Sequence, residues 1–129
     1  MQDMKKQSKV SKAGEEGAVF DIVERCLVVR LNSELDHHNA IPIREKADKL
    51  IERNHIKHII FDFSGVNFMD SAGIGVIMGR YKKVIFIGGK TAVTCVNTSV
   101  DRIFRLSGLY KIIDKFETVE DALQGMQTV

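Results

Sequence analysis

The sequence predicts an α/β fold, because segments with the pattern of strands alternate with segments that have the pattern of helices. The clearest strand is the nearly continuous apolar run at 58–63, which is typical of a strand covered on both faces in a parallel sheet. The clearest helix lies at about 72–87, where apolar residues recur at the i, i+3, i+4, i+7 spacing of an amphipathic helix.

The first third of the chain supplies a hairpin and a helix. Residues 1–17 are polar, with few large apolar side chains, and we expect them to form a disordered tail before a domain at 18–129. Two β-rich runs at 19–23 and 26–31 predict an antiparallel hairpin. Asn39 is the expected N-cap of a helix that ends near Asn54 and has Ile41 on its apolar face.

The second half continues the alternation after Gly88-Gly89 ends the helix at 72–87. Two threonines, each followed three residues later by an aspartate, have the spacing of a capping box at a helix start. The predicted elements are a strand at 91–96, a helix from Thr98 to Gly108, a short edge strand at Ile112-Ile113 and a helix from Thr118 through Met126.

Composition narrows the classes of function. The 129 residues, 44% hydrophobic and 28% charged, fit one globular domain, and a net charge of +2 is too small for a nucleic-acid partner. The chain lacks the roughly 18 consecutive apolar residues of a membrane span, as well as a signal peptide, so we expect a cytoplasmic protein with no membrane partner. Cys26 and Cys95 lie in β-like runs and are expected to be buried free thiols.

The segment Asp70-Ser71-Ala72-Gly73-Ile74-Gly75 is the strongest candidate for a functional site. Ser71 follows the predicted central strand, at the expected N-cap of the next helix. Gly73, Gly75 and Gly79 lie in that helix, although each glycine costs about 1 kcal/mol relative to alanine. Gly75 and Gly79 share a face, so either the sheet or another protein approaches the backbone there, and the sequence favours neither explanation.

Phosphorylation of Ser71 is compatible with this position. A phosphoryl group would add about −1.5 to −2 charges at a helix N-terminus, where the dipole and free N–H groups favour an anion. The fold is therefore expected to survive the modification, whereas the same charge would oppose a partner bound over the segment. We interpret the segment as a phosphorylatable docking surface with no catalysis of its own.

Catalytic and metal-binding interpretations fit less well. The G-x-S-x-G nucleophile elbow needs a glycine where this chain has Met69, and the glycine spacing is one residue longer than the dinucleotide-binding fingerprint. A small nucleotide-binding protein is therefore the weakest alternative. Asp36-His37-His38 has residue types that bind zinc, but adjacent histidine side chains usually diverge, so we expect no metal and no cofactor.

Four motifs together carry a family resemblance: Ser33-Glu-Leu-Asp-His-His38, Phe68-Met-Asp-Ser-Ala-Gly-Ile-Gly75, Gly79-Arg-Tyr-Lys82 and Arg105-Leu-Ser-Gly-Leu109. From Val19 to about Met126 the chain resembles the STAS-domain anti-sigma factor antagonists, or anti-anti-sigma factors, of the stage II sporulation type. The resemblance implies a single STAS-like domain with a mixed β-sheet of about four or five strands and about four helices. At 84–87 the chain departs from a more polar family pattern, and Phe86 is expected to be exposed for contact.

The resemblance also implies a mechanism of partner switching. The unphosphorylated protein would bind a nucleotide-carrying anti-sigma factor with serine kinase activity and so release the sporulation sigma factor. That kinase would phosphorylate Ser71 and end binding, and a serine phosphatase would restore it. The implied partner-binding residues are Glu34, Leu35, Asp36, Asp70, Ser71, Gly73, Ile74 and Gly75. We expect a non-enzymatic protein that is monomeric when free; the main alternative is a STAS partner-switching or scaffold module of another stress pathway.

Overall fold

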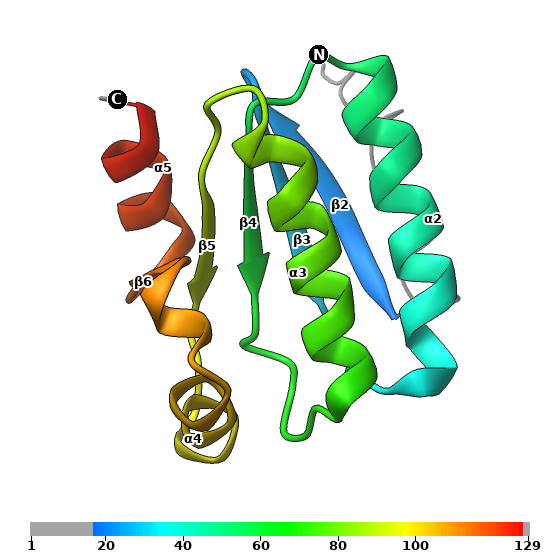
Figure 1. The fold of residues 1–129 in the computed structure, drawn as a ribbon, viewed down its shortest axis with the longest axis vertical. Helices are drawn as coiled ribbons and strands as arrows, with labels where there is room; N and C mark the ends of the chain where they lie inside the picture. Colours follow the sequence, from blue (N-terminus) through cyan, green and yellow to red (C-terminus); the bar gives the residue numbers. More distant parts are fainter. Residues whose placement is uncertain (1–16, 128–129) are drawn as a thin grey trace, which may run out of the picture.

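The computed structural model describes residues 17–127, whose backbone forms one mixed sheet with helices on both faces (Figure 1). β2 and β3 are antiparallel, whereas β3, β4, β5 and β6 are parallel, so the predicted α/β class, hairpin and mixed sheet are confirmed. The predicted tail at 1–17 lies outside the described residues, apart from Gly17. The five strands lie side by side in chain order: β2 (Ala18–Val23), β3 (Cys26–Leu31), β4 (His58–Asp62), β5 (Thr91–Thr94) and β6 (Asp114–Phe116).

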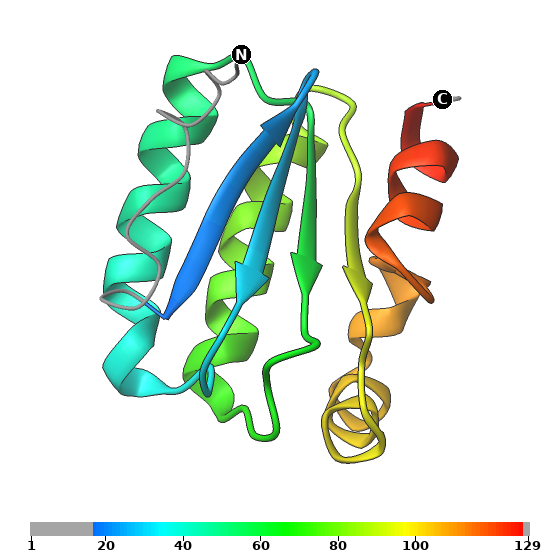
Figure 2. The same cartoon turned by 180° about the vertical axis from the view of Figure 1, so that it is seen from behind.

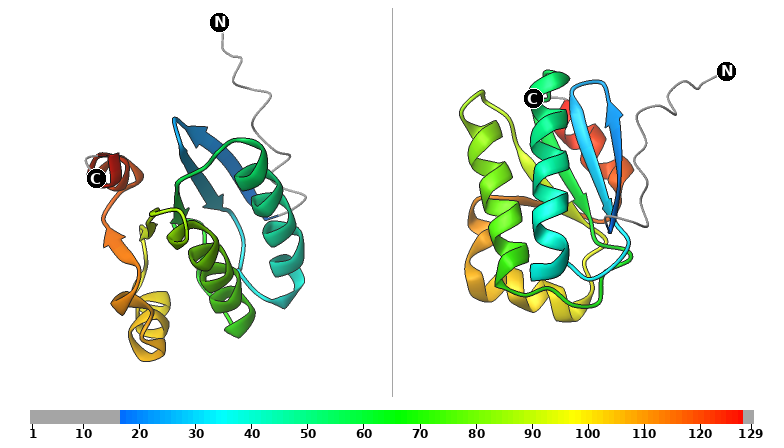
Figure 3. Two further views of the ribbon diagram at one scale, coloured as in Figure 1. Left: turned by 45° about the horizontal axis from the view of Figure 1, so that its top comes forward. Right: turned by 90° about the vertical axis from the view of Figure 1, so that its right-hand side faces the viewer.

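The helices cover the sheet unequally. α2 and α3 cover one face, and α5 packs against the other (Figures 2 and 3). The alternation along β3 explains this, because Leu27 and Val29 face the core beneath α2 and α3, whereas Val28 faces α5. The helical elements are α2 (His37–Arg53), α3 (Ser71–Ile85), α4 (Thr98–Ser107), a 3₁₀-helix (Leu109–Lys111) and α5 (Val119–Gln127). Within 17–127 no helix combines the length and apolar character needed to cross a membrane.

The first helix begins before the predicted cap. Asp36, not Asn39, is the N-cap of α2, because the Asp36 carboxylate accepts hydrogen bonds from the backbone amides of His38 (3.0 Å) and Asn39 (3.2 Å). The Asn39 side chain instead donates to the carbonyl of Glu34 (2.7 Å). Asn39 therefore ties the helix to the preceding loop and leaves the capping to Asp36.

One of the two threonine caps is confirmed. Thr118 precedes α5, and its hydroxyl accepts a hydrogen bond from the backbone amide of Asp121 (3.0 Å). At α4 the prediction is wrong by one residue, because the cap is Asn97, whose side chain accepts from the amide of Val100 (2.9 Å). Thr98 is the first residue of that helix.

Two expectations in apolar segments are wrong. Ile112-Ile113 is not a strand; β6 begins immediately after it, and Ile113 is buried in the core. Cys26 is a buried free thiol as predicted, but Cys95 follows β5 and is exposed. Cys95 has a φ of 57°, in the left-handed region, so the backbone turns there and carries the thiol out of the strand pattern.

Asp101 in the first turn of α4 joins three elements through its carboxylate. It accepts hydrogen bonds from the hydroxyl of Tyr110 (2.6 Å), from Nζ of Lys115 (2.9 Å) and from Nε of Arg105 (2.7 Å). The bonds from Tyr110, Lys115 and Arg105 hold the pKa of Asp101 well below its ordinary value. The carboxylate therefore fixes α4 against the 3₁₀-helix and β6.

We predict that Asp101→Asn lowers the free energy of unfolding at pH 7 by about 1 to 3 kcal/mol, because it weakens charge-assisted hydrogen bonds. A depressed folded-state pKa contributes stability above the ordinary pKa and loses it as the pH falls through the folded-state value. The mutant should therefore lose less stability on acidification than the wild type, measured by urea unfolding at pH 7 and in acid. The control is Asp114→Asn, an exposed carboxylate on β6; equal losses in the two variants would refute the role of Asp101.

Candidate functional site

The predicted site residues meet at the carboxyl edge of the parallel strands. β3 and β4 deliver the loops 32–36 and 63–70 to this edge, at the lower end of the molecule in Figure 1. Leu35 and Met69 form an isolated parallel bridge between the loops. The amide of Leu35 donates to the carbonyl of Phe68 (3.2 Å), and the amide of Asp70 donates to the carbonyl of Leu35 (3.3 Å). We call this surface, with the first two turns of α3, the Ser71 end.

Glu34 fastens the two loops from the other side. Its Oε1 accepts hydrogen bonds from the backbone amides of Asn67 (3.2 Å) and Phe68 (3.0 Å). These amides belong to the loop before α3, so the Glu34 carboxylate holds the backbone that leads to Ser71. Glu34 thus has a structural role that the sequence did not predict.

Asp70, and not Ser71 as predicted, is the N-cap of α3. Its Oδ1 accepts from the amide of Ala72 (2.8 Å), while Oδ2 accepts from the amide of His37 (3.3 Å) and lies 3.4 Å from His37 Nδ1. Partial burial alone would raise the pKa of Asp70, but hydrogen bonds from the His37 side chain and from backbone amides outweigh it and lower the pKa. Asp70 therefore stays ionised at neutral pH and links the starts of α2 and α3.

Ser71 is left free by this arrangement. It is the first residue of α3, its side chain is exposed, and in the described part of the chain its hydroxyl makes no hydrogen bond. The hydroxyl is therefore accessible from solvent without the loss of any contact that the described residues make. The adjacent Ala72 carries no second hydroxyl that would compete for modification.

The three glycines of α3 have different roles. A Cβ on Gly73 would collide with the Met69 side chain and lie 2.8 Å from the carbonyl oxygen of Leu35, so this glycine allows α3 to meet the bridge. A Cβ on Gly75 or Gly79 would meet nothing within 4 Å. Packing therefore explains Gly73 alone, and the other two glycines leave a backbone surface open to a partner.

The remaining predicted residues divide into buried and accessible positions. Leu35 is fully buried beneath the surface, whereas Ile74 is half-buried and Asp36 caps α2.

Two exposed apolar side chains at this end, Phe68 and Ile41, were not predicted from the sequence, and each is 53% exposed. Ile41 is thus not on the buried face of its helix. It lines a shallow hollow between α2 and α3, together with His37, Ala40, Arg44, Ala72, Gly75 and Val76.

The histidine pair does not assemble a metal site. The rings of His37 and His38 lie with their centroids 4.1 Å apart, and His37 is directed to Asp70. Among residues 17–127, no three His, Cys, Asp or Glu side chains are grouped so that they could hold a metal ion. The site therefore offers capped helix starts, an exposed hydroxyl and exposed apolar side chains.

Comparison with known proteins defines the class to which this fold and site belong. Residues 18–122 match the STAS domain model, so the chain belongs to the STAS domain family. It is 42% identical over 103 residues, 80% of this chain and 88% of the relative, to the anti-sigma F factor antagonist of Paenibacillus polymyxa. The resemblance inferred from the four motifs is confirmed.

Solved structures with the same fold include two that bear the name SpoIIAA, one unphosphorylated and one phosphorylated. The anti-sigma factor antagonist SpoIIAA in its unphosphorylated form has a TM-score of 0.72 and 26% identity, covering 87% of this chain and 99% of that one. The Bacillus cell fate determinant SpoIIAA in the phosphorylated form has a TM-score of 0.68 and 30% identity, covering 83% and 96%. The chain is thus similar to SpoIIAA structures in an unphosphorylated and a phosphorylated form.

The glycine geometry gives a test of stability. We predict that Gly73→Ala lowers the free energy of unfolding by about 2 kcal/mol or more, because the methyl group overpacks the bridge. Gly79→Ala, the matched control on the same helix, should raise it by up to about 1 kcal/mol through helix propensity. Thermal and urea unfolding of both variants measure the difference, and an innocuous Gly73→Ala would contradict the packing role.

Proposed function

We propose that this protein is a cytoplasmic, non-enzymatic anti-sigma factor antagonist whose Ser71 end binds an anti-sigma factor. The unphosphorylated form would bind a nucleotide-carrying anti-sigma factor with serine kinase activity, and so release the sporulation sigma factor. Phosphorylation of Ser71 by that kinase would end binding, and a serine phosphatase would restore it. The similarity to anti-sigma factor antagonists supports the kind of partner.

The observation that carries the proposal is the exposed hydroxyl of Ser71, which makes no hydrogen bond to residues 17–127, on a surface held by other residues. Glu34, Asp36 and Asp70 accept hydrogen bonds from backbone amides and support the loops. Ser71 is exposed among them. A phosphoryl group would therefore change the charge of the surface and leave the supporting bonds in place.

Electrostatics explain how phosphate would weaken the complex. The Ser71 end already carries three carboxylates, and a phosphoryl group would add about −1.5 to −2 charges beside them. A partner that covers Ser71 would have to desolvate this charge, and any carboxylate that it placed there would be repelled. The helix dipole of α3 would meanwhile keep the phosphorylated free protein folded.

We predict that the cognate anti-sigma kinase with ATP labels the wild type and not Ser71→Ala, as measured by phosphoprotein mass spectrometry. Ser71→Asp should weaken the complex at least about tenfold, whereas Ser71→Ala should bind about as well as the wild type. Calorimetric titration measures both affinities, and the free energy of unfolding of Ser71→Asp should change by less than about 1 kcal/mol.

If Ser71→Ala still became phosphorylated, Ser71 would not be the phosphoacceptor. Tighter binding to the anti-sigma factor of a general stress pathway than to the sporulation factor would favour the alternative STAS module. If Ser71→Asp bound the anti-sigma factor as tightly as the wild type, the protein would dock to its partner without being switched by charge at Ser71.

The open glycine face supplies a second test. Gly75→Ala should leave the fold at least as stable, yet weaken binding to the anti-sigma factor several-fold, because its methyl group would hold the partner off the helix backbone. The control is Ser71→Ala, which adds no bulk to the same surface and should bind about as well as the wild type. Undiminished affinity of Gly75→Ala would remove this face from the interface.

A further inference from the structure

The opposite end of α3 carries a second hollow. It lies between the C-terminal ends of α2 and α3, beside the hairpin turn at Arg25, and we call it the amino-end groove because β3 and β4 begin there. Its apolar lining is Ile51, Ile56, Phe86 and Ile87, and its polar lining is Arg25, Glu52, His55 and Lys83.

Two apolar side chains of this groove, those of Phe86 and Ile87, are largely exposed, whereas Ile56 is buried and Ile51 is half-buried. Phe86 is 90% exposed, Ile87 is 53% exposed and Ile85 is 49% exposed. Phe86 and Ile87 both line the groove and form an exposed apolar patch of the kind that marks interaction sites. Because Phe86 buries so little of its ring, its side chain adds almost nothing to the stability of the free chain.

The segment that presents Phe86 is held in place by backbone hydrogen bonds. The amides of Ile87 and Gly89 donate to the carbonyl of Val84 at 3.0 and 2.8 Å. Gly88 has a φ of +81°, and Gly89 packs directly against the backbone of Lys57, so side chains at these two positions would disturb the turn. The patch is therefore preorganised, which lowers the entropic cost of binding.

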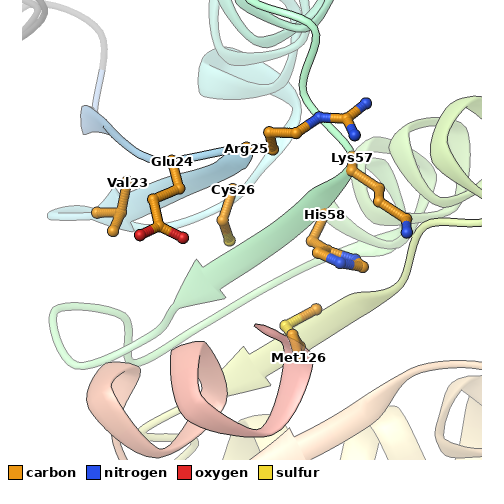
Figure 4. Close-up of a pocket in the computed structure, with 7 residues that line it drawn as sticks. All are labelled: Val23, Glu24, Arg25, Cys26, Lys57, His58 and Met126. Atoms are coloured by element: carbon orange, nitrogen blue, oxygen red, sulfur yellow. The ribbon is translucent and has the colours of Figure 1, made fainter. Parts of the chain in front are cut away.

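Two cations, Arg25 and Lys83, lie beside the apolar lining. Figure 4 shows a neighbouring hollow that Arg25 also lines, and in this view the Arg25 side chain extends away from Cys26. The Nε of Arg25 donates a hydrogen bond to the carbonyl of His55 (3.1 Å). Lys83 lies at the rim, where its Nζ is 3.9 Å from Oδ1 of Asp48. Lys82 and Lys83, in the last turn of α3, also stabilise the helix through its dipole. Their positive charge is therefore not sufficient evidence for a binding site. Among the described residues that line the groove, Arg25 and Lys83 are two cations and Glu52 is the one carboxylate.

We propose that the amino-end groove binds an acidic amphipathic segment of a protein partner. Apolar side chains of the segment would pack on Phe86, Ile87 and Ile51, and its carboxylates would lie near Arg25 and Lys83. A concave lining that includes both polar and apolar groups suits a peptide segment better than a bilayer surface. α3 has 15 residues and is about 22 Å long, so this segment and a partner at the Ser71 end could be bound at the same time.

The probe is a helical peptide of about 12 residues with leucines at i, i+3, i+4 and i+7 and glutamates elsewhere. Titrated into the ¹⁵N-labelled full chain, it should shift amide resonances at 51–56 and 83–89 and leave those at 68–75 unmoved. Phe86→Ala should weaken binding at least about tenfold. The matched control Leu106→Ala removes another highly exposed apolar side chain, 82% exposed on α4, and should bind like the wild type. Circular dichroism should show both variants folded.

Four outcomes would overturn the proposal. The first is no binding of the acidic peptide at about 1 mM, and the second is equal binding of a peptide with lysines in place of the glutamates. The third is concentration-dependent dimerisation in sedimentation that Phe86→Ala abolishes, which would assign the groove to a second copy of this chain. The fourth is Phe86-dependent binding to phosphatidylcholine vesicles with about 30% phosphatidylglycerol, without peptide binding, which would assign it to a membrane.

Discussion

The pairing of two loops beyond the carboxyl edge of the sheet is the constraint on which the Ser71 end depends. The isolated bridge between Leu35 and Met69 extends the β3–β4 pairing past the strands. Gly73 completes the constraint, because any side chain there would occupy space that both bridge residues fill. The start of α3 is therefore fixed against the loop before α2, and the two helices present their first turns on one surface.

The polar residues of this surface divide into three carboxylates that support its backbone and Ser71, the proposed site of modification. Glu34, Asp36 and Asp70 accept hydrogen bonds from backbone amides of loop or helix starts, so replacing any of them would leave amides unpaired. Within residues 17–127, the Ser71 hydroxyl accepts no hydrogen bond from a backbone amide. Under the proposed function, a modification at Ser71 would therefore alter recognition while the support stays intact, so that the switch would operate without unfolding.

The order of strands and helices is predictable because it depends on local periodicity, as in the apolar run of β4 and the amphipathic spacing of α3. The errors arise where a distant contact decides. Asp70 and Ser71 are both good caps, and Asp70 holds the position while also bonding His37, 33 residues away. Spacing cannot separate buried Gly73 from open Gly75, since the difference lies in what packs above them. Two of the three residues of β6 are charged, so its sequence lacks the apolar pattern that would predict its parallel pairing with β5.

The partly buried ion pair between Arg80 of α3 and Asp48 of α2 bears on how the two ends of α3 communicate. Arg80, with its side chain 6% exposed, places Nε 2.9 Å from Oδ1 of Asp48. Desolvating two charges offsets much of their attraction, whereas separating them would leave a charge buried without its partner. We therefore expect the pair to oppose sliding of α3 along α2 more than it adds to net stability. A phosphoryl group on Ser71 that leaves α3 in this register would leave Phe86 and its turn where they are, so the two surfaces should be occupied independently.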